Sequence, residues 1–163
     1  MKTIEELQHF LNIEVFNLLK NLNADVKPKW GNMDARQMVE HMPLALQVAN
    51  GKRVLALATP EDRVLKVKNI ALLSDRPLQK GFKNVALPVD PLAYMHDNLE
   101  TAIVALKQEI DDFHQSFAGN PEQKRLHNIF GELSYHEWLW FHYKHFIHHF
   151  SQFGLMDEVE RIA

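Results

Sequence analysis

A histidine-rich run near the C-terminal end of the chain has the clearest chemical potential. The sequence HYKHFIHH spans His142 to His149 in a segment of helical periodicity, which places His145 and His149 four residues apart on one helical face. Two imidazoles at this spacing can bind one metal ion, and catalytic zinc sites use three protein ligands and a water. His41, two turns into another predicted helix, is the candidate third ligand. We therefore predict a divalent-metal site at His41, His145 and His149.

Neighbouring side chains compete for this role or support it. His142 with His145, and His145 with His148, are each three residues apart, a spacing that also lets two rings share an ion. The candidate catalytic residues, for proton transfer or ligand orientation, are His142, His148 and Gln152. Trp138 is the candidate for an aromatic wall of the site. Phe146 stands where the His-Glu-x-x-His metalloproteases need their general-base glutamate, so peptide hydrolysis by that route is disfavoured.

The remaining histidines are expected to serve the fold rather than a site. Isolated histidines are most often partly buried residues whose polar tips are satisfied. We apply this interpretation to four of them, namely His9, His96, His114 and His136. His127 is intermediate between these residues and the cluster.

Helix start signals define the elements that must position these side chains. Capping boxes, each followed by apolar residues at three- and four-residue spacing, predict helices that begin after Thr3, Asp34 and Ser134. Asp90-Pro91, as a cap and a first helical residue, predicts another long helix that runs to Gly119. No convincing alternating strand pattern is present. Residues 1–163 are therefore predicted to form one all-α domain, a four-helix bundle.

Two parts of this predicted bundle are irregular. A long, partly irregular segment, residues 52–89, joins the second and third long helices and contains a short helix around Asp62 to Leu73. A connection of this length usually covers something or forms a lid. Pro43 lies inside the second helix and predicts a kink beside His41, because an interior proline removes one helical hydrogen bond.

The face of the last helix opposite His145 is also apolar. It carries Trp140, Tyr143, Ile147 and Phe150. A helix that is apolar on both sides must be covered on both sides. We therefore expect this face to pack under residues 52–89 or against a second subunit.

Composition excludes several classes of function. The chain has no cysteine, so a metal must be held by nitrogen and oxygen ligands. A formal net charge of -3 with scattered lysines argues against a nucleic-acid partner. No window approaches the length of a membrane span, and the N-terminal sequence MKTIEELQHF lacks the basic start and unbroken apolar stretch of a signal peptide. We expect a cytoplasmic protein that does not bind membranes.

The motifs together resemble those of the DinB-like family of metal-dependent four-helix-bundle proteins. The resemblance spans almost the whole chain and rests on Trp30 and Gln37-Met38-x-x-His41, on Phe130-Gly131-x-Leu133-Ser134-x-x-Glu137-Trp138, and on Tyr143-Lys144-His145-x-x-His148-His149-x-x-Gln152-Phe153-Gly154. It implies a DinB-like bundle in which His41, His145 and His149 bind a divalent metal in an open site. It also implies a homodimer and, by analogy with characterised relatives, a transferase or isomerase that uses a low-molecular-weight thiol as cosubstrate. The similarity is to a branch whose members mainly have no known function.

These observations predict a metal-dependent transferase or hydrolase that acts on a small-molecule substrate with Zn²⁺ or Ni²⁺ bound by three neutral imidazoles. Hydrolysis and thiol transfer remain open alternatives. A second hypothesis is a non-catalytic helical bundle that binds a small molecule or a partner. A third is a purely structural metal, which requires a closed four-ligand shell. Glu40 is a candidate fourth ligand that the spacing does not require.

Overall fold

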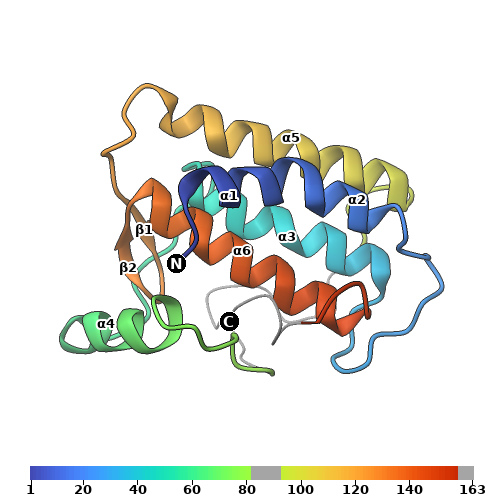
Figure 1. Cartoon of the computed structure of the whole chain (residues 1–163), viewed down its shortest axis with the longest axis horizontal. Helices are drawn as coiled ribbons and strands as arrows, with labels where there is room; N and C mark the ends of the chain where they lie inside the picture. The colour runs from blue at the N-terminus through green and yellow to red at the C-terminus, as the bar shows by residue number, and fades with distance from the viewer. Residues whose placement is uncertain (82–92, 158–163) are drawn as a thin grey trace.

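The computed structural model describes residues 1–81 and 93–157, most of which are helical. Long helical segments lie side by side, flanked by a short helix and a small hairpin (Figure 1). In chain order the elements are α1 (Ile4–His9), the π-helical turn η1 (Phe10–Glu14), α2 (Val15–Leu19), α3 (Ala35–Ala49), α4 (Glu61–Val67), the π-helical turn η2 (Lys68–Leu72), α5 (Leu99–Ala118), β1 (Arg125–His127), β2 (Gly131–Leu133) and α6 (Tyr135–Gln152). The mostly helical content agrees with the predicted all-α class.

The long helices surround one apolar core. α1, η1 and α2 follow one another without a break; this run contacts α6 through α1 and α5 through η1, while α3 contacts both α5 and α6. α3 and α5 run in one direction, and the first run and α6 run in the other (Figure 1). The chain between α3 and α5 must therefore return along the length of the assembly, which explains the long connection. Core side chains from all four segments are fully buried, including Leu7, Met38, Leu106, Phe113 and Phe146.

Three helices begin where the capping boxes predicted. The side chains of Thr3, Asp34 and Ser134 each accept a hydrogen bond from the backbone amide three residues later, and the side chain at that position returns a bond to the cap. α3 continues through Pro43, which is buried inside the helix. Gly51, with φ +84°, follows the end of α3, as its predicted stop signal requires.

The predicted start of the third long helix is wrong. Residues 93–98 are not helical, and α5 begins at Leu99; Asp90 and Pro91 themselves lie outside the described residues. Asn98 is the actual cap, since its side chain accepts a bond of 2.9 Å from the amide of Thr101. The backbone amides of Met95 and His96, just before the cap, donate instead to the carboxylate of Glu40 on α3.

A short hairpin was not predicted. β1 and β2 pair antiparallel, with Arg125 opposite Leu133 and His127 opposite Gly131. Strands of three residues are too short to show a period of two, so no alternating pattern could indicate them. Gly131 has φ +71°, and a Cβ at this position would lie 2.6 Å from Cγ1 of Val64, so glycine is required where α4 approaches the hairpin.

The aromatic face of α6 is covered within the chain. Trp140 donates from Nε1 to the carbonyl of Leu72 at 2.7 Å, and the buried ammonium of Lys144 donates to the carbonyls of Ala71, Leu72 and Ser74 at 2.8, 3.1 and 3.0 Å. Residues 71–74 therefore cover Trp140, in agreement with the first of the two predicted alternatives for that residue. Tyr143 on the same face packs instead against Phe10 of η1, edge-on at 4.6 Å between centroids, so the N-terminal segment covers part of this face.

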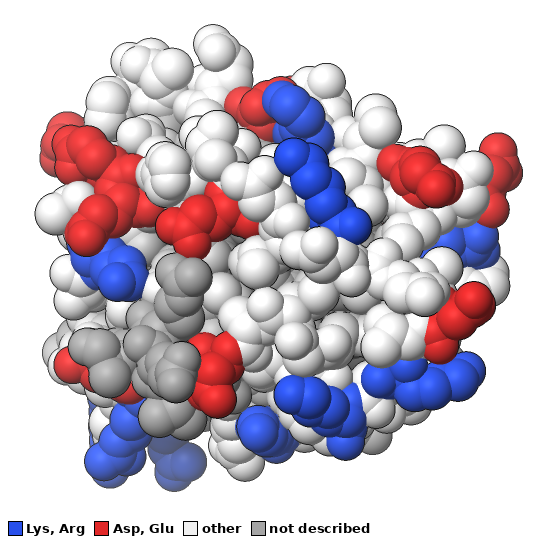
Figure 2. Space-filling model, turned by 45° about the vertical axis from the view of Figure 1, so that its right-hand side comes forward, with Lys and Arg blue, Asp and Glu red and all other residues white. Residues whose placement is uncertain are grey.

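Charged side chains of both signs are spread over the surface. On the face drawn in Figure 2, acidic side chains lie on both the left and the right, basic side chains lie near the top and along the lower edge, and uncharged side chains fill much of the middle. This pattern agrees with the near balance of 18 basic and 21 acidic residues. Among residues 1–81 and 93–157, no helix combines the length and apolar character that crossing a bilayer requires.

Candidate metal centre

Three histidines predicted as metal ligands come together where α3 packs against α6. His41 projects from the second turn of α3, and His145 and His149 project from successive turns of α6. Nε2 of His145 lies 3.3 Å from Nε2 of His41 and 3.1 Å from Nε2 of His149. Each residue offers one ligand atom within 4.8 Å of the other two. Side chains 104 residues apart in sequence thus share one site.

The separations are compatible with a common metal ion. An ion with tetrahedral geometry and bonds of about 2.05 Å to nitrogen places its ligand atoms about 3.3 Å apart. Both separations from His145 match that value, and all three ligand atoms lie within 4.8 Å of one another. His145 and His149 remain 9% and 7% exposed, and His41 is only partly buried, which leaves the group an approach from solvent.

Gln152 holds the ring of His149 in the orientation that a ligand needs. Nδ1 of His149 lies 2.6 Å from Oε1 of Gln152, and Nε2 of Gln152 donates to the carbonyl of Trp30 at 3.3 Å. Because the amide oxygen can only accept, Nδ1 of His149 carries the proton and Nε2 presents a lone pair. Partners of this kind fix the tautomer of metal-binding histidines.

The loop before α3 closes the edge of the site against the end of α6. The amide of Lys29 donates to the carbonyl of Gln152 at 2.6 Å, and the ring of Trp30 meets His148 edge-on at 4.7 Å between centroids. Gly31 has φ +83°, and a Cβ there would lie 2.8 Å from Nε2 of Gln152. The glycine thus allows the backbone to approach the side chain that orients His149.

The positions of the ring protons show why a cation suits this cluster. Nε2 of His149 carries a lone pair, and Nε2 of His145 lies between this atom and Nε2 of His41. One N–H at His145 can be directed at only one of these two neighbours. Nδ1 of His145 is buried and has no hydrogen-bond partner among the described residues. A cation that accepts all three lone pairs removes the conflict at the centre.

Burial keeps His145 and His149, the two α6 histidines of the cluster, in the neutral form. Desolvation lowers the pKa of His145 well below its usual range, and the nearby rings of His149 and His41 lower it further. Desolvation likewise lowers the pKa of His149, with a smaller contribution from His41, while the Gln152 bond acts in the opposite direction. Neutral imidazole is the form that coordinates a metal.

The other predicted site residues occupy different positions. His148 lies beside the cluster, between Trp30 and His149. His142 is fully buried, stacked on Trp138 and edge-on to Phe113, and neither of its ring nitrogens has a hydrogen-bond partner within the described part of the chain. Trp138 is a core residue that donates to the carbonyl of Arg125, so it lines the interior rather than an approach to the cluster.

Some remaining histidines have structural partners. Nε2 of His136 lies 2.8 Å from the carbonyl of Lys2, and His114 bonds to Tyr135 and Asn12. His127 is buried in the hairpin, where Nδ1 accepts from the amides of Ile129 and Phe130 at 3.0 and 3.4 Å. These contacts agree with the structural interpretation for His114 and His136 and extend it to His127.

Glu40 has a role that sequence reasoning missed. Its two carboxylate oxygens accept hydrogen bonds from the backbone amides of Met95 and His96, at 3.0 and 2.9 Å, and one of them also lies 3.7 Å from Nε of Arg36. The carboxylate is therefore engaged with residues 95 and 96 and with Arg36. A glutamate next to His41 in sequence suggested ligation, and only the fold reveals these other contacts.

Searches for related proteins returned no match among family models, curated proteins or solved structures.

Proposed function

We propose that this protein is a metal-dependent enzyme in which His41, His145 and His149 hold one divalent ion in an open site. The observation that carries the proposal is the convergence of three imidazole nitrogens from two helices, with the two separations from His145 close to the ligand spacing around zinc. The bond from Gln152 to His149 and the depressed pKa values of His145 and His149 support it.

The donor set favours Zn²⁺ or Ni²⁺. Neutral imidazole nitrogen is a ligand for both ions, and the chain has no cysteine that would provide a softer thiolate site. Glu40 is engaged by the amides of Met95 and His96, so we assign the protein ligands as three histidines. Three protein ligands leave at least one coordination position for a water, a thiol or a substrate oxygen.

The chemistry of the site follows from its surroundings. A bound divalent ion lowers the pKa of a coordinated water or thiol and so supplies a nucleophile near neutral pH. Trp30 and His148 form an aromatic edge beside the ligands that a small-molecule substrate can contact, and His148 is the better placed of the two histidine candidates for proton transfer. His142 is fully buried and does not reach a substrate from this position. Hydrolysis and transfer to a thiol cosubstrate both fit this site.

We also propose that the fold is a four-helix bundle of DinB-like type. The sequence resemblance supports this assignment, as does a chain course in which α3 and α5 run in one direction and the flanking long helices in the other. A homodimer remains part of the proposal through that resemblance alone, because Trp140, Tyr143, Ile147 and Phe150, which suggested a second subunit, are buried within the chain. The same burial removes the observation that favoured a non-catalytic partner-binding surface.

Elemental analysis of untagged protein tests the proposal. We expect close to one equivalent of Zn²⁺ or Ni²⁺ in the native protein after reconstitution, and none in His145→Ala. His9→Ala is the matched control: His9 is exposed on α1, so this variant should retain the metal. Stoichiometric metal in His145→Ala would refute the ligand assignment. A metal-loaded protein in which a chelator lowers the melting temperature strongly, and whose shell is closed by four protein ligands, would instead indicate a structural ion.

A further inference from the structure

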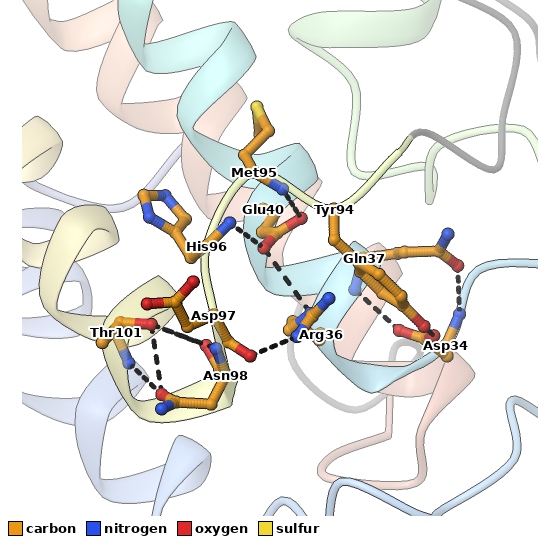
Figure 3. A network of polar contacts seen from close by, with 10 residues as sticks. All are labelled: Asp34, Arg36, Gln37, Glu40, Tyr94, Met95, His96, Asp97, Asn98 and Thr101. Atoms are coloured by element: carbon orange, nitrogen blue, oxygen red, sulfur yellow. Dashed lines mark hydrogen bonds and ion pairs between the residues drawn. The ribbon is translucent and has the colours of Figure 1, made fainter.

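A buried carboxylate fastens a short segment of chain to α3. Glu40 is 1% exposed, and its two oxygens accept hydrogen bonds from the amides of Met95 and His96 (Figure 3). Hydrogen bonds to a charged acceptor are roughly twice as strong as neutral ones. We call residues 94–97 the strap, because each of them contacts the first half of α3.

The rest of the strap is tied down by Arg36 and Asp34. The guanidinium of Arg36 lies over the ring of Tyr94, 3.3 Å from its centroid, and donates to the carbonyl of Asp97 at 2.7 Å. The hydroxyl of Tyr94 donates to Asp34, the residue that caps α3. In Figure 3, Glu40 lies between Arg36 and the backbone of Met95 and His96, and it contacts all three.

The strap grips the part of α3 that carries a proposed metal ligand. Glu40, which binds the strap, directly precedes His41, the proposed metal ligand. A single peptide unit therefore links the strap contact to the metal centre. α3 has a second tie at its other end, where the carboxylate of Glu109 on α5 accepts from Gln47, Asn50 and Lys52 at 3.2, 3.0 and 3.0 Å. One carboxylate thus anchors each half of the helix, and only Glu40 is next in sequence to a proposed ligand.

We infer that Glu40 is a positioning residue for the metal centre: by holding the strap on α3 it fixes the turn that presents His41, so strap closure and metal affinity are coupled. This inference rests on the proposed function. A ligand set tolerates errors of only about 0.5 Å, so its supporting contacts influence affinity. Coupling of this kind is reciprocal: a metal that favours the closed strap is itself bound more tightly when the strap is closed.

Two matched substitutions test the coupling. Glu40→Gln leaves one acceptor oxygen for two amides and turns an NH₂ group toward the other, so it opens the strap. Glu109→Gln makes the same chemical change at the far tie of α3. Zn²⁺ affinity, measured by competition with a chromophoric chelator, should fall roughly tenfold in Glu40→Gln and stay within about twofold of native in Glu109→Gln.

Amide hydrogen exchange followed by NMR gives a readout that a merely structural role would not change. Zn²⁺ should slow exchange at Met95 and His96 in the native protein and in Glu109→Gln, because both amides bond to Glu40. If Glu40→Gln does not fold, Arg36→Ala replaces it and should weaken Zn²⁺ binding in the same direction.

The outcomes separate the two claims. Native protein that binds no Zn²⁺ would overturn the proposed function and the coupling together. Native protein that binds Zn²⁺, with equal affinities in the two glutamine variants or with exchange at Met95 and His96 unaffected by Zn²⁺, would overturn the coupling alone. Selective weakening in Glu40→Gln, together with metal-dependent protection of the two amides, supports it.

Discussion

Acid should destabilise this protein through histidines that the fold keeps neutral, and His127 permits a worked estimate. Burial lowers the pKa of His127 from 6.5 to about 3. Above pH 6.5 the ring is neutral in both the native and the unfolded state, so its titration has no effect on stability. Below that pH the unfolded chain takes up a proton that the native state refuses until about pH 3. The free energy of unfolding therefore falls by about 1.4 kcal/mol per pH unit, or about 2 kcal/mol at pH 5.

A substitution that removes the titration isolates this effect. His127→Asn keeps an acceptor for the amides of Ile129 and Phe130 but has no imidazole to protonate. Urea unfolding at pH 7.5 and pH 5.0, with a chelator present, gives the pH-dependent loss for each protein. We expect the loss to be about 2 kcal/mol smaller in His127→Asn than in the native protein, whatever the absolute stabilities. Equal losses in the two proteins would refute the claim that His127 stays neutral in the native state.

Three further predictions follow from contacts around the site. Gln152→Ala frees the ring of His149 and should weaken Zn²⁺ binding by roughly 10- to 100-fold in a chelator competition, so native affinity would contradict the orienting role. His142→Phe replaces a buried ring with no hydrogen bond among the described residues and should raise the free energy of unfolding by about 1 kcal/mol in urea; a large fall would reveal a polar partner. Gly131→Ala should lower the free energy of unfolding by about 1–3 kcal/mol and the melting temperature with it, because the added Cβ would meet Val64 and φ is +71°. An unchanged melting temperature would contradict this.

Three helix starts and the convergence of His41, His145 and His149 could be predicted, because the signals for them lie close together in sequence. A capping box needs only Ser134 and Glu137, and the pair His145 and His149 needs only helical spacing. His41 was found because its helix start could be located from Asp34. Local signals of this kind identified the side chains of the candidate site before their spatial arrangement was known.

Features that depend on contacts between distant segments could not be predicted. α5 begins at Leu99 rather than near Asp90 because the residues before it bond to Glu40, and nothing in their own sequence indicates that partner. The bond from Gln152 to the carbonyl of Trp30 joins positions 122 residues apart. The burial of Lys144 is similar, because its carbonyl partners belong to η2 and the turn after it.

X-ray absorption spectroscopy of the zinc-loaded protein should decide whether the three histidines form an open metal site, because it reports both the ligand atoms and any free coordination position. We expect three imidazole nitrogens at about 2.0–2.1 Å from zinc and at least one oxygen ligand, with the nitrogen signal lost in His145→Ala. A shell of four protein ligands, or a spectrum that His145→Ala leaves unchanged, would contradict an open site at His41, His145 and His149.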